Sequence, residues 1–80
     1  MRTQTDGEAI RQLREELGLS NFALAQRAGL SPAYMSRLEN EERQGSLQAR
    51  TKVAVALGVP LARISKPVPR RVPAQAEQAA

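Results

Sequence analysis

The side chains of this sequence are better suited to recognition than to catalysis. The chain has no His and no Cys. Acid–base catalysis would therefore rest on a few carboxylates, and a zinc ion would lack its usual ligands. We expect no enzyme activity, no metal site and no cofactor. Side chains that could donate hydrogen bonds to a partner instead follow one another closely between residues 31 and 43.

The segment that carries these donors has the pattern of a short helix. Ser31 can cap the helix, and Pro32 takes the first position, where a missing N–H does no harm. Successive residues of an α-helix are about 100° apart around its axis. If Met35 and Leu38 face inward, the outward positions are Ala33, Ser36, Arg37 and Asn40, with Pro32 and Tyr34 on the flanks.

A second short helix, predicted over Asn21–Ala28, precedes this one closely in the chain. Gly29 ends it and can take the left-handed conformation that a sharp turn needs. Ala25 is small at the position where the two helices would meet, since a bulky residue would push them apart. The pair has the requirements of a helix-turn-helix, with a small core formed by Leu24, Leu30, Met35 and Leu38.

The rest of the chain predicts further helices that would support this pair. Thr5 and Glu8 have the spacing of a capping box at the start of a first helix. A fourth helix, Leu47–Leu57, follows the cap Ser46, and Pro60 opens a short fifth helix or turn. No strand-period alternation is visible. The sequence therefore predicts an all-α fold, a compact bundle of about five short helices.

Length and charge divide the chain into one domain and a tail. Its 80 residues make one domain at most. Residues 7–65 contain eight basic and six acidic residues and therefore have a net charge of +2. Residues 66–80 contain three basic residues and one acidic residue and add another +2. We expect a domain over 1–65 and a disordered basic, Pro- and Ala-rich tail over 66–80. With neither a signal peptide nor a run of about 20 apolar residues, we expect a cytoplasmic chain that does not contact membranes.

Three motifs, in order, resemble the lambda-repressor-like, Cro-type (Xre) helix-turn-helix family. They read IRQLREELGLS, LAQRAGLSPAYMSRLEN and KVAVALGV, within residues 10–64. The resemblance covers about three quarters of the chain. It implies a five-helix bundle whose second and third helices bind double-stranded DNA, in a bacterial or phage-encoded, nucleoid-associated protein.

The resemblance also implies which side chains meet base edges. In a helix-turn-helix these belong to the N-terminal part of the second, reading helix. Arg37 could bond guanine through two acceptors, although it could also be a solvated surface Arg. The base-reading candidates are Pro32, Ala33, Ser36 and Arg37.

Other side chains are candidates for phosphate contacts. Asn21 begins a helix, where free N–H groups favour an anion. Tyr34 either packs its ring on the bundle or offers its hydroxyl to a phosphate, and Arg43 either contacts phosphate or is solvated. In similar domains the positions of Arg14 and Glu39 form an ion pair. The phosphate candidates are Arg14, Asn21, Tyr34, Asn40 and Arg43.

Three residues depart from the family pattern. Glu41 stands where Gly is common, and Gly45 stands where Pro is common, so we expect a longer third helix and a looser loop. Arg50 replaces an apolar residue and would carry its charge to the surface over its apolar stem. The core beside the fourth helix is then thin, and we expect a partly exposed patch at Val55, Val59 and Leu61.

These features predict a sequence-specific DNA-binding transcriptional regulator, a repressor that acts as a homodimer at least on DNA. One short reading helix contacts few bases, and two copies on neighbouring half-sites add their contacts. Two alternatives remain open. The chain could be an antitoxin whose tail holds a partner protein, or a protein-interaction module that does not bind DNA.

Overall fold

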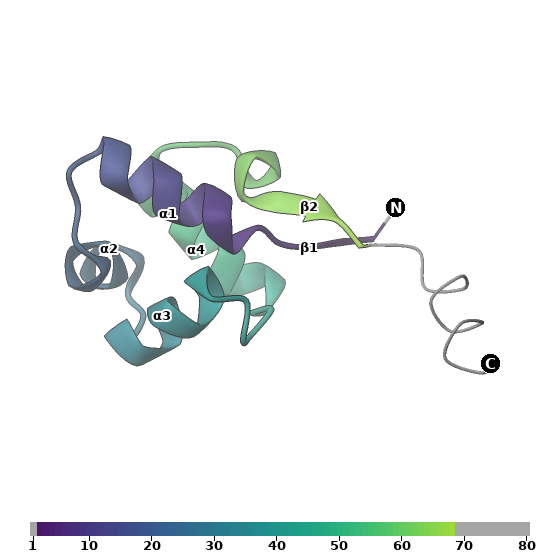
Figure 1. The fold of residues 1–80 in the computed structure, drawn as a ribbon, viewed down its shortest axis with the longest axis horizontal. Coiled ribbons are helices and arrows are strands. Elements are labelled where there is room, and N and C mark those ends of the chain that lie inside the picture. The colour runs from purple at the N-terminus through teal and green to yellow at the C-terminus, as the bar shows by residue number, and fades with distance from the viewer. Residues whose placement is uncertain (1, 69–80) are drawn as a thin grey trace.

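The computed structural model describes residues 2–68. These residues form four α-helices, one 3-10 helix and a pair of short strands (Figure 1). In chain order the elements are β1 (Thr3–Thr5), α1 (Gly7–Glu16), α2 (Asn21–Ala28), α3 (Pro32–Glu39), α4 (Leu47–Leu57), η1 (Leu61–Ile64) and β2 (Ser65–Pro67).

Each α-helix begins at a side-chain cap. The side chains of Ser20, Ser31 and Ser46 accept hydrogen bonds from the backbone N–H three residues later, as predicted. The first helix differs from the prediction, since Asp6 caps it through the N–H of Ala9. Thr5, predicted to be the cap, is instead fully buried in β1.

A small apolar core lies where the four α-helices and η1 meet. Its fully buried side chains include Ile10, Leu24, Met35, Leu38, Val53 and Ile64. Phe22 of α2 is apolar but lies outside this core and is 56% exposed. Val55 is exposed and Val59 and Leu61 are partly exposed, as expected, and the latter two also pack against the core. No helix within residues 2–68 is long and apolar enough to cross a membrane.

The strand pair corrects the all-α prediction. β1 and β2 are antiparallel, with Gln4 opposite Lys66 (Figure 1). Lys66 and Pro67, assigned to the tail from the sequence, therefore belong to a strand. The predicted fifth helix or turn is a 3-10 helix of four residues, so a five-helix bundle is not confirmed. Val68 follows this strand, and the other residues of the predicted tail, 69–80, lie outside the described residues.

The end of α3 also differs from the prediction. The helix ends at Glu39 and is followed by Asn40, so it is not extended. Glu41 then takes a left-handed backbone conformation with φ of 59°, which is unusual for a residue with a side chain. Glu41 therefore occupies the left-handed turn position at which the family pattern commonly has Gly.

Candidate nucleic-acid interface

The turn between α2 and α3 is built as the sequence predicted. Gly29 has a φ of 72°, and the N–H of Leu30 donates to the carbonyl of Ala25 over 2.9 Å. Ala25 is fully buried, in a helix that packs on both α3 and α4. The small side chain lets the helices approach closely, which fixes the orientation of α3.

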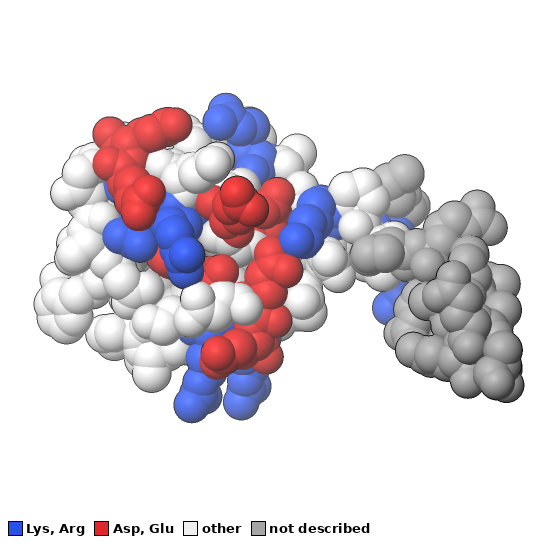
Figure 2. Space-filling model, viewed as in Figure 1, with Lys and Arg blue, Asp and Glu red and all other residues white. Residues whose placement is uncertain are grey.

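The outward face of α3 carries the predicted base-reading residues. Pro32, Ala33 and Arg37 are exposed, and Ser36 is half-buried. We call these four residues the reading face. Within residues 2–68 the side chain of Arg37 makes no hydrogen bond or ion pair. Figure 2 shows basic side chains projecting from the edge of the molecule below α3. The guanidinium of Arg37 is therefore available to a ligand.

The predicted phosphate candidates divide into free and engaged side chains. Arg43 is exposed in the loop after α3 and has no side-chain partner among the described residues. Tyr34 is half-buried and packs against the core, while a Cβ built on Gly45 would lie 3.2 Å from its hydroxyl. The ring therefore packs on the bundle, and a phosphate contact from the hydroxyl stays a prediction.

Arg14 forms the expected ion pair with Glu39. Its Nε donates to Glu39 Oε2 over 2.8 Å and its Nη2 to Oε1 over 3.1 Å. Its Nη1 donates to the carbonyl of Leu19 over 2.9 Å. The hydrogen bond with Glu39 raises the pKa of Arg14 above its ordinary value. All three nitrogens of the guanidinium are engaged within the protein, so Arg14 connects α1 to α3.

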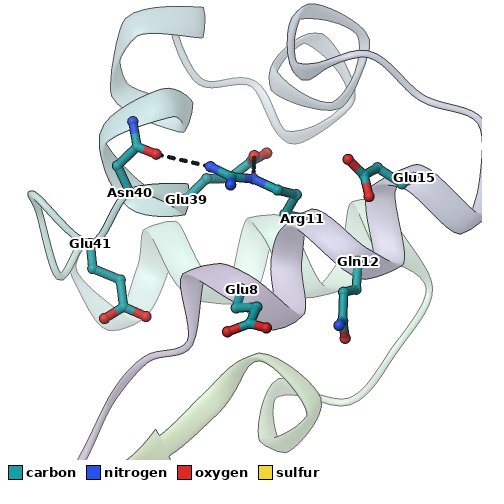
Figure 3. Close-up of a pocket in the computed structure, with 7 residues that line it drawn as sticks. All are labelled: Glu8, Arg11, Gln12, Glu15, Glu39, Asn40 and Glu41. Carbon is teal, nitrogen blue, oxygen red and sulfur yellow. Dashed lines mark hydrogen bonds and ion pairs between the residues drawn. The ribbon is translucent and has the colours of Figure 1, made fainter.

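Two further side chains join this pair. Arg11 Nε lies 3.4 Å from Glu39 Oε1, and Arg11 Nη2 donates to Asn40 Oδ1 over 2.9 Å (Figure 3). Asn21 Nδ2 lies 3.5 Å from Glu39 Oε2. We call Arg11, Arg14, Asn21 and Glu39 the Glu39 junction. The sequence analysis missed Arg11, although its place three residues before Arg14 on one helix face could have indicated it.

The face over α1 carries mostly acidic side chains. A hollow of about 500 Å³ lies there, lined by Glu8, Arg11, Gln12, Glu15, Glu39, Asn40 and Glu41 (Figure 3). Figure 2 shows the acidic side chains gathered on this face. Within residues 2–68 no cluster of His, Cys, Asp and Glu is suited to hold a metal ion. An acidic face of this kind repels anions such as phosphates.

Comparison with curated proteins identifies regulators as relatives. The model of a helix-turn-helix domain family matches residues 7–66. The HTH-type transcriptional regulator RamB of Mycobacterium tuberculosis is 36% identical over 53 residues, which cover 66% of this chain and 11% of RamB. The immunity repressor protein of Bacillus phage phi105 is 35% identical over 60 residues, which cover 75% of this chain and 42% of the repressor. This chain therefore spans less than half the length of either relative.

Several solved structures of other proteins share the fold. The restriction-modification controller protein C.AhdI from Aeromonas hydrophila matches with a TM-score of 0.69 and 35% identity, covering 71% of this chain and 86% of that chain. SinR, described as the master regulator for biofilm formation and solved in complex with DNA, matches with a TM-score of 0.66 and 35% identity. That match covers 70% of this chain and 90% of the SinR chain.

Proposed function

Because this chain belongs to the helix-turn-helix domain family, we propose that it is a DNA-binding transcriptional regulator whose helix α3 enters the major groove. The resemblance to lambda-repressor-like regulators predicted from the sequence is confirmed by these matches. The single observation that carries the proposal is the exposed reading face, in which Arg37 has no partner within residues 2–68. An unpaired Arg on an outward helix face can bond guanine through two acceptors.

Each side chain of the reading face suits a different contact. Arg37 would specify a guanine, Ala33 is small enough to contact a thymine methyl, and Ser36 would bond a base or a phosphate. Exposed Pro32 begins α3 and would lie near the base edges, because the N-terminal part of a reading helix meets them.

The phosphate contacts are assigned by availability. Arg43 is exposed and unpaired among the described residues, so it is the strongest candidate. Tyr34, Asn21 and Asn40 each keep at least one polar group that could reach the DNA backbone. Arg14 would act through the Glu39 junction, since its guanidinium is already engaged.

The functional form we propose is a repressor that binds as a homodimer. α3 has eight residues and reaches few bases, so a single copy would discriminate weakly. Two copies on half-sites about one helical turn, roughly 34 Å, apart would add their contacts. The similarity to a phage immunity repressor supports repression as the direction of control.

Selection of bound duplexes from a random DNA pool tests the proposal. We expect enrichment of two similar half-sites, related by two-fold symmetry, with a guanine at a fixed place in each. Enrichment of a single half-site would contradict the proposed homodimer but would still support a DNA-binding regulator. A pool that remains random after selection would contradict DNA reading and favour a protein-interaction module.

A further inference from the structure

Glu41 holds two parts of the chain that are far from it in sequence. Its Oε2 accepts a hydrogen bond of 3.0 Å from the backbone N–H of Gly7 and another of 2.7 Å from Lys66 Nζ. Gly7 is the first residue of α1, where backbone N–H groups have no partner within the helix. One carboxylate therefore joins the start of α1 and strand β2 to the residue that follows the end of α3.

The start of α1 rests directly on the last turn of α3. A Cβ built on Gly7 would lie 2.7 Å from the carbonyl oxygen of Leu38, and closer still to that of Glu39. Gly7 is buried at this contact. The end of α3 is therefore fixed against α1 at a distance that only glycine permits, and Glu41 provides the polar bonds that hold it there.

The same loop is held a second time by strand β1. The N–H of Thr5 donates to Gln44 Oε1 over 3.0 Å, and the hydroxyl of Thr5 donates to the carbonyl of Gln44. Arg43 lies between these two anchors, at Glu41 and Gln44. The strand pair that the sequence did not predict thus holds the loop that carries the strongest phosphate candidate.

We propose that Glu41 is a positioning residue, which holds the last turn of α3 and the loop of Arg43 in the orientation in which the reading face meets DNA. The inference rests on the proposed function. Base-edge hydrogen bonds tolerate little misorientation, whereas attraction to the phosphate backbone depends mainly on charge. If the contact of Glu41 is loosened, the discrimination between a selected DNA site and random DNA should therefore fall more than the affinity for random DNA.

The test compares Glu41→Gln with Glu42→Gln, because both remove one negative charge from the same loop. Glu42 is exposed and has no side-chain partner among the described residues. The measurement is the ratio of the affinity for a selected site to the affinity for random duplex at one salt concentration. We expect the ratio to fall about two- to fivefold for Glu41→Gln, the range of an exposed ion pair, and to stay unchanged for Glu42→Gln.

A second variant separates positioning from folding. Glu41→Gly removes both hydrogen bonds and suits the left-handed backbone, so the domain should remain folded. Amide hydrogen exchange of the free protein should then be faster at Gly7, while Leu13, in the interior of α1, stays unchanged. The sequence discrimination should fall at least as far as it does for Glu41→Gln.

The outcomes distinguish this inference from the proposed function. A wild-type chain without any sequence preference overturns the proposed function, and this inference with it. A wild-type chain that discriminates normally, with equal ratios for Glu41→Gln and Glu42→Gln, overturns the inference alone. Unchanged exchange at Gly7 in Glu41→Gly overturns it as well, since the contact would then hold nothing.

Discussion

The two sides of α3 use the same kinds of side chain in opposite ways. At the Glu39 junction the side chain of Arg14 is 15% exposed and that of Glu39 is 3% exposed, and their charges are paired. On the reading face, Arg37 is exposed and unpaired within residues 2–68. The charges of the junction are paired with one another and hold three helices together, whereas the charge of Arg37 on the reading face is unpaired among the described residues.

This difference explains how a mildly basic domain could bind DNA. Six acidic residues between 7 and 65 nearly balance eight basic ones, so overall charge favours binding only weakly. Arg11 and Arg14 share the single carboxylate of Glu39, so the junction keeps one net positive charge but its guanidinium groups are engaged within the protein. The remaining contrast lies between the acidic face over α1 (Figure 2) and two basic side chains elsewhere, Arg37 and Arg43, which are exposed.

Glu39→Ala should have the largest effect and should act on folding. Removal of one partner of a buried ion pair typically costs about 3–5 kcal/mol, because the other charge stays buried without compensation. Arg14 is 15% exposed and would keep its hydrogen bond to the carbonyl of Leu19, so we expect a loss near the lower end of this range, which is still a large share of the stability of a small domain. Urea unfolding measures the free energy of unfolding directly.

Glu42→Ala is the control for this variant. Glu42 is exposed in the neighbouring loop, and we expect its loss to change stability by less than about 0.5 kcal/mol. If Glu39→Ala behaved like Glu42→Ala, the junction would be an ordinary solvated ion pair. The contrast between the two sides of α3 would then be much weaker.

Ala25→Leu should follow in size, also through folding. Ala25 is fully buried, in a helix that packs on both α3 and α4. Overpacking such a contact typically costs about 1–3 kcal/mol. The matched control is Ala33→Leu, at an exposed position of α3, which should leave the melting temperature nearly unchanged. Equal melting temperatures for both variants would show that the helices do not meet at Ala25.

The helix-turn-helix was predictable because its signals are local. α2 and α4 begin and end where the sequence placed them, since Ser20 and Ser46 cap their starts and Gly29 and Gly58 take left-handed conformations at their ends. The contact at Ala25 was also predictable, because a small residue at this position of α2 lets the next helix approach closely.

The strand pair and the turn at Glu41 were not predictable in this way. Strands of three residues show no alternation, and Pro67 argues against a strand. A left-handed Glu is stabilised by partners 34 and 25 residues away, Gly7 and Lys66. A pattern within a short stretch of sequence cannot indicate contacts between residues so far apart in the chain.

Arg37→Ala should act on DNA binding and leave folding unchanged. Loss of a bidentate contact to guanine typically weakens specific binding by about 1–3 kcal/mol and relaxes preference at one base pair of each half-site. Arg27→Ala is the control, because Arg27 is also exposed and unpaired among the described residues but lies on α2. An equal loss on specific and random DNA would show that Arg37 contacts only phosphate.

The smallest effect is expected from the pH dependence of the contact that Glu41 makes with Gly7 and Lys66. The hydrogen bond from Lys66, and then that from Gly7, lowers the pKa of Glu41 below its ordinary value of 4.5. A depressed pKa in the folded state means that the contact stabilises the protein above that ordinary value. The stabilisation is lost as the pH falls through the folded-state pKa.

Urea unfolding of the wild type and of Glu41→Gly at about pH 6 and about pH 3 measures this linkage. The change in backbone strain adds the same offset at both pH values, so only the carboxylate changes the difference in stability between the two proteins. We expect the wild type to lose more stability on acidification than the variant. The effect should be small and should shrink in high salt, because the side chains of Glu41 and Lys66 are 32% and 35% exposed. If the wild type and Glu41→Gly lose equal stability on acidification, the Glu41 carboxylate is not hydrogen-bonded in solution. The contrast with the reading face would then rest on Glu39 alone.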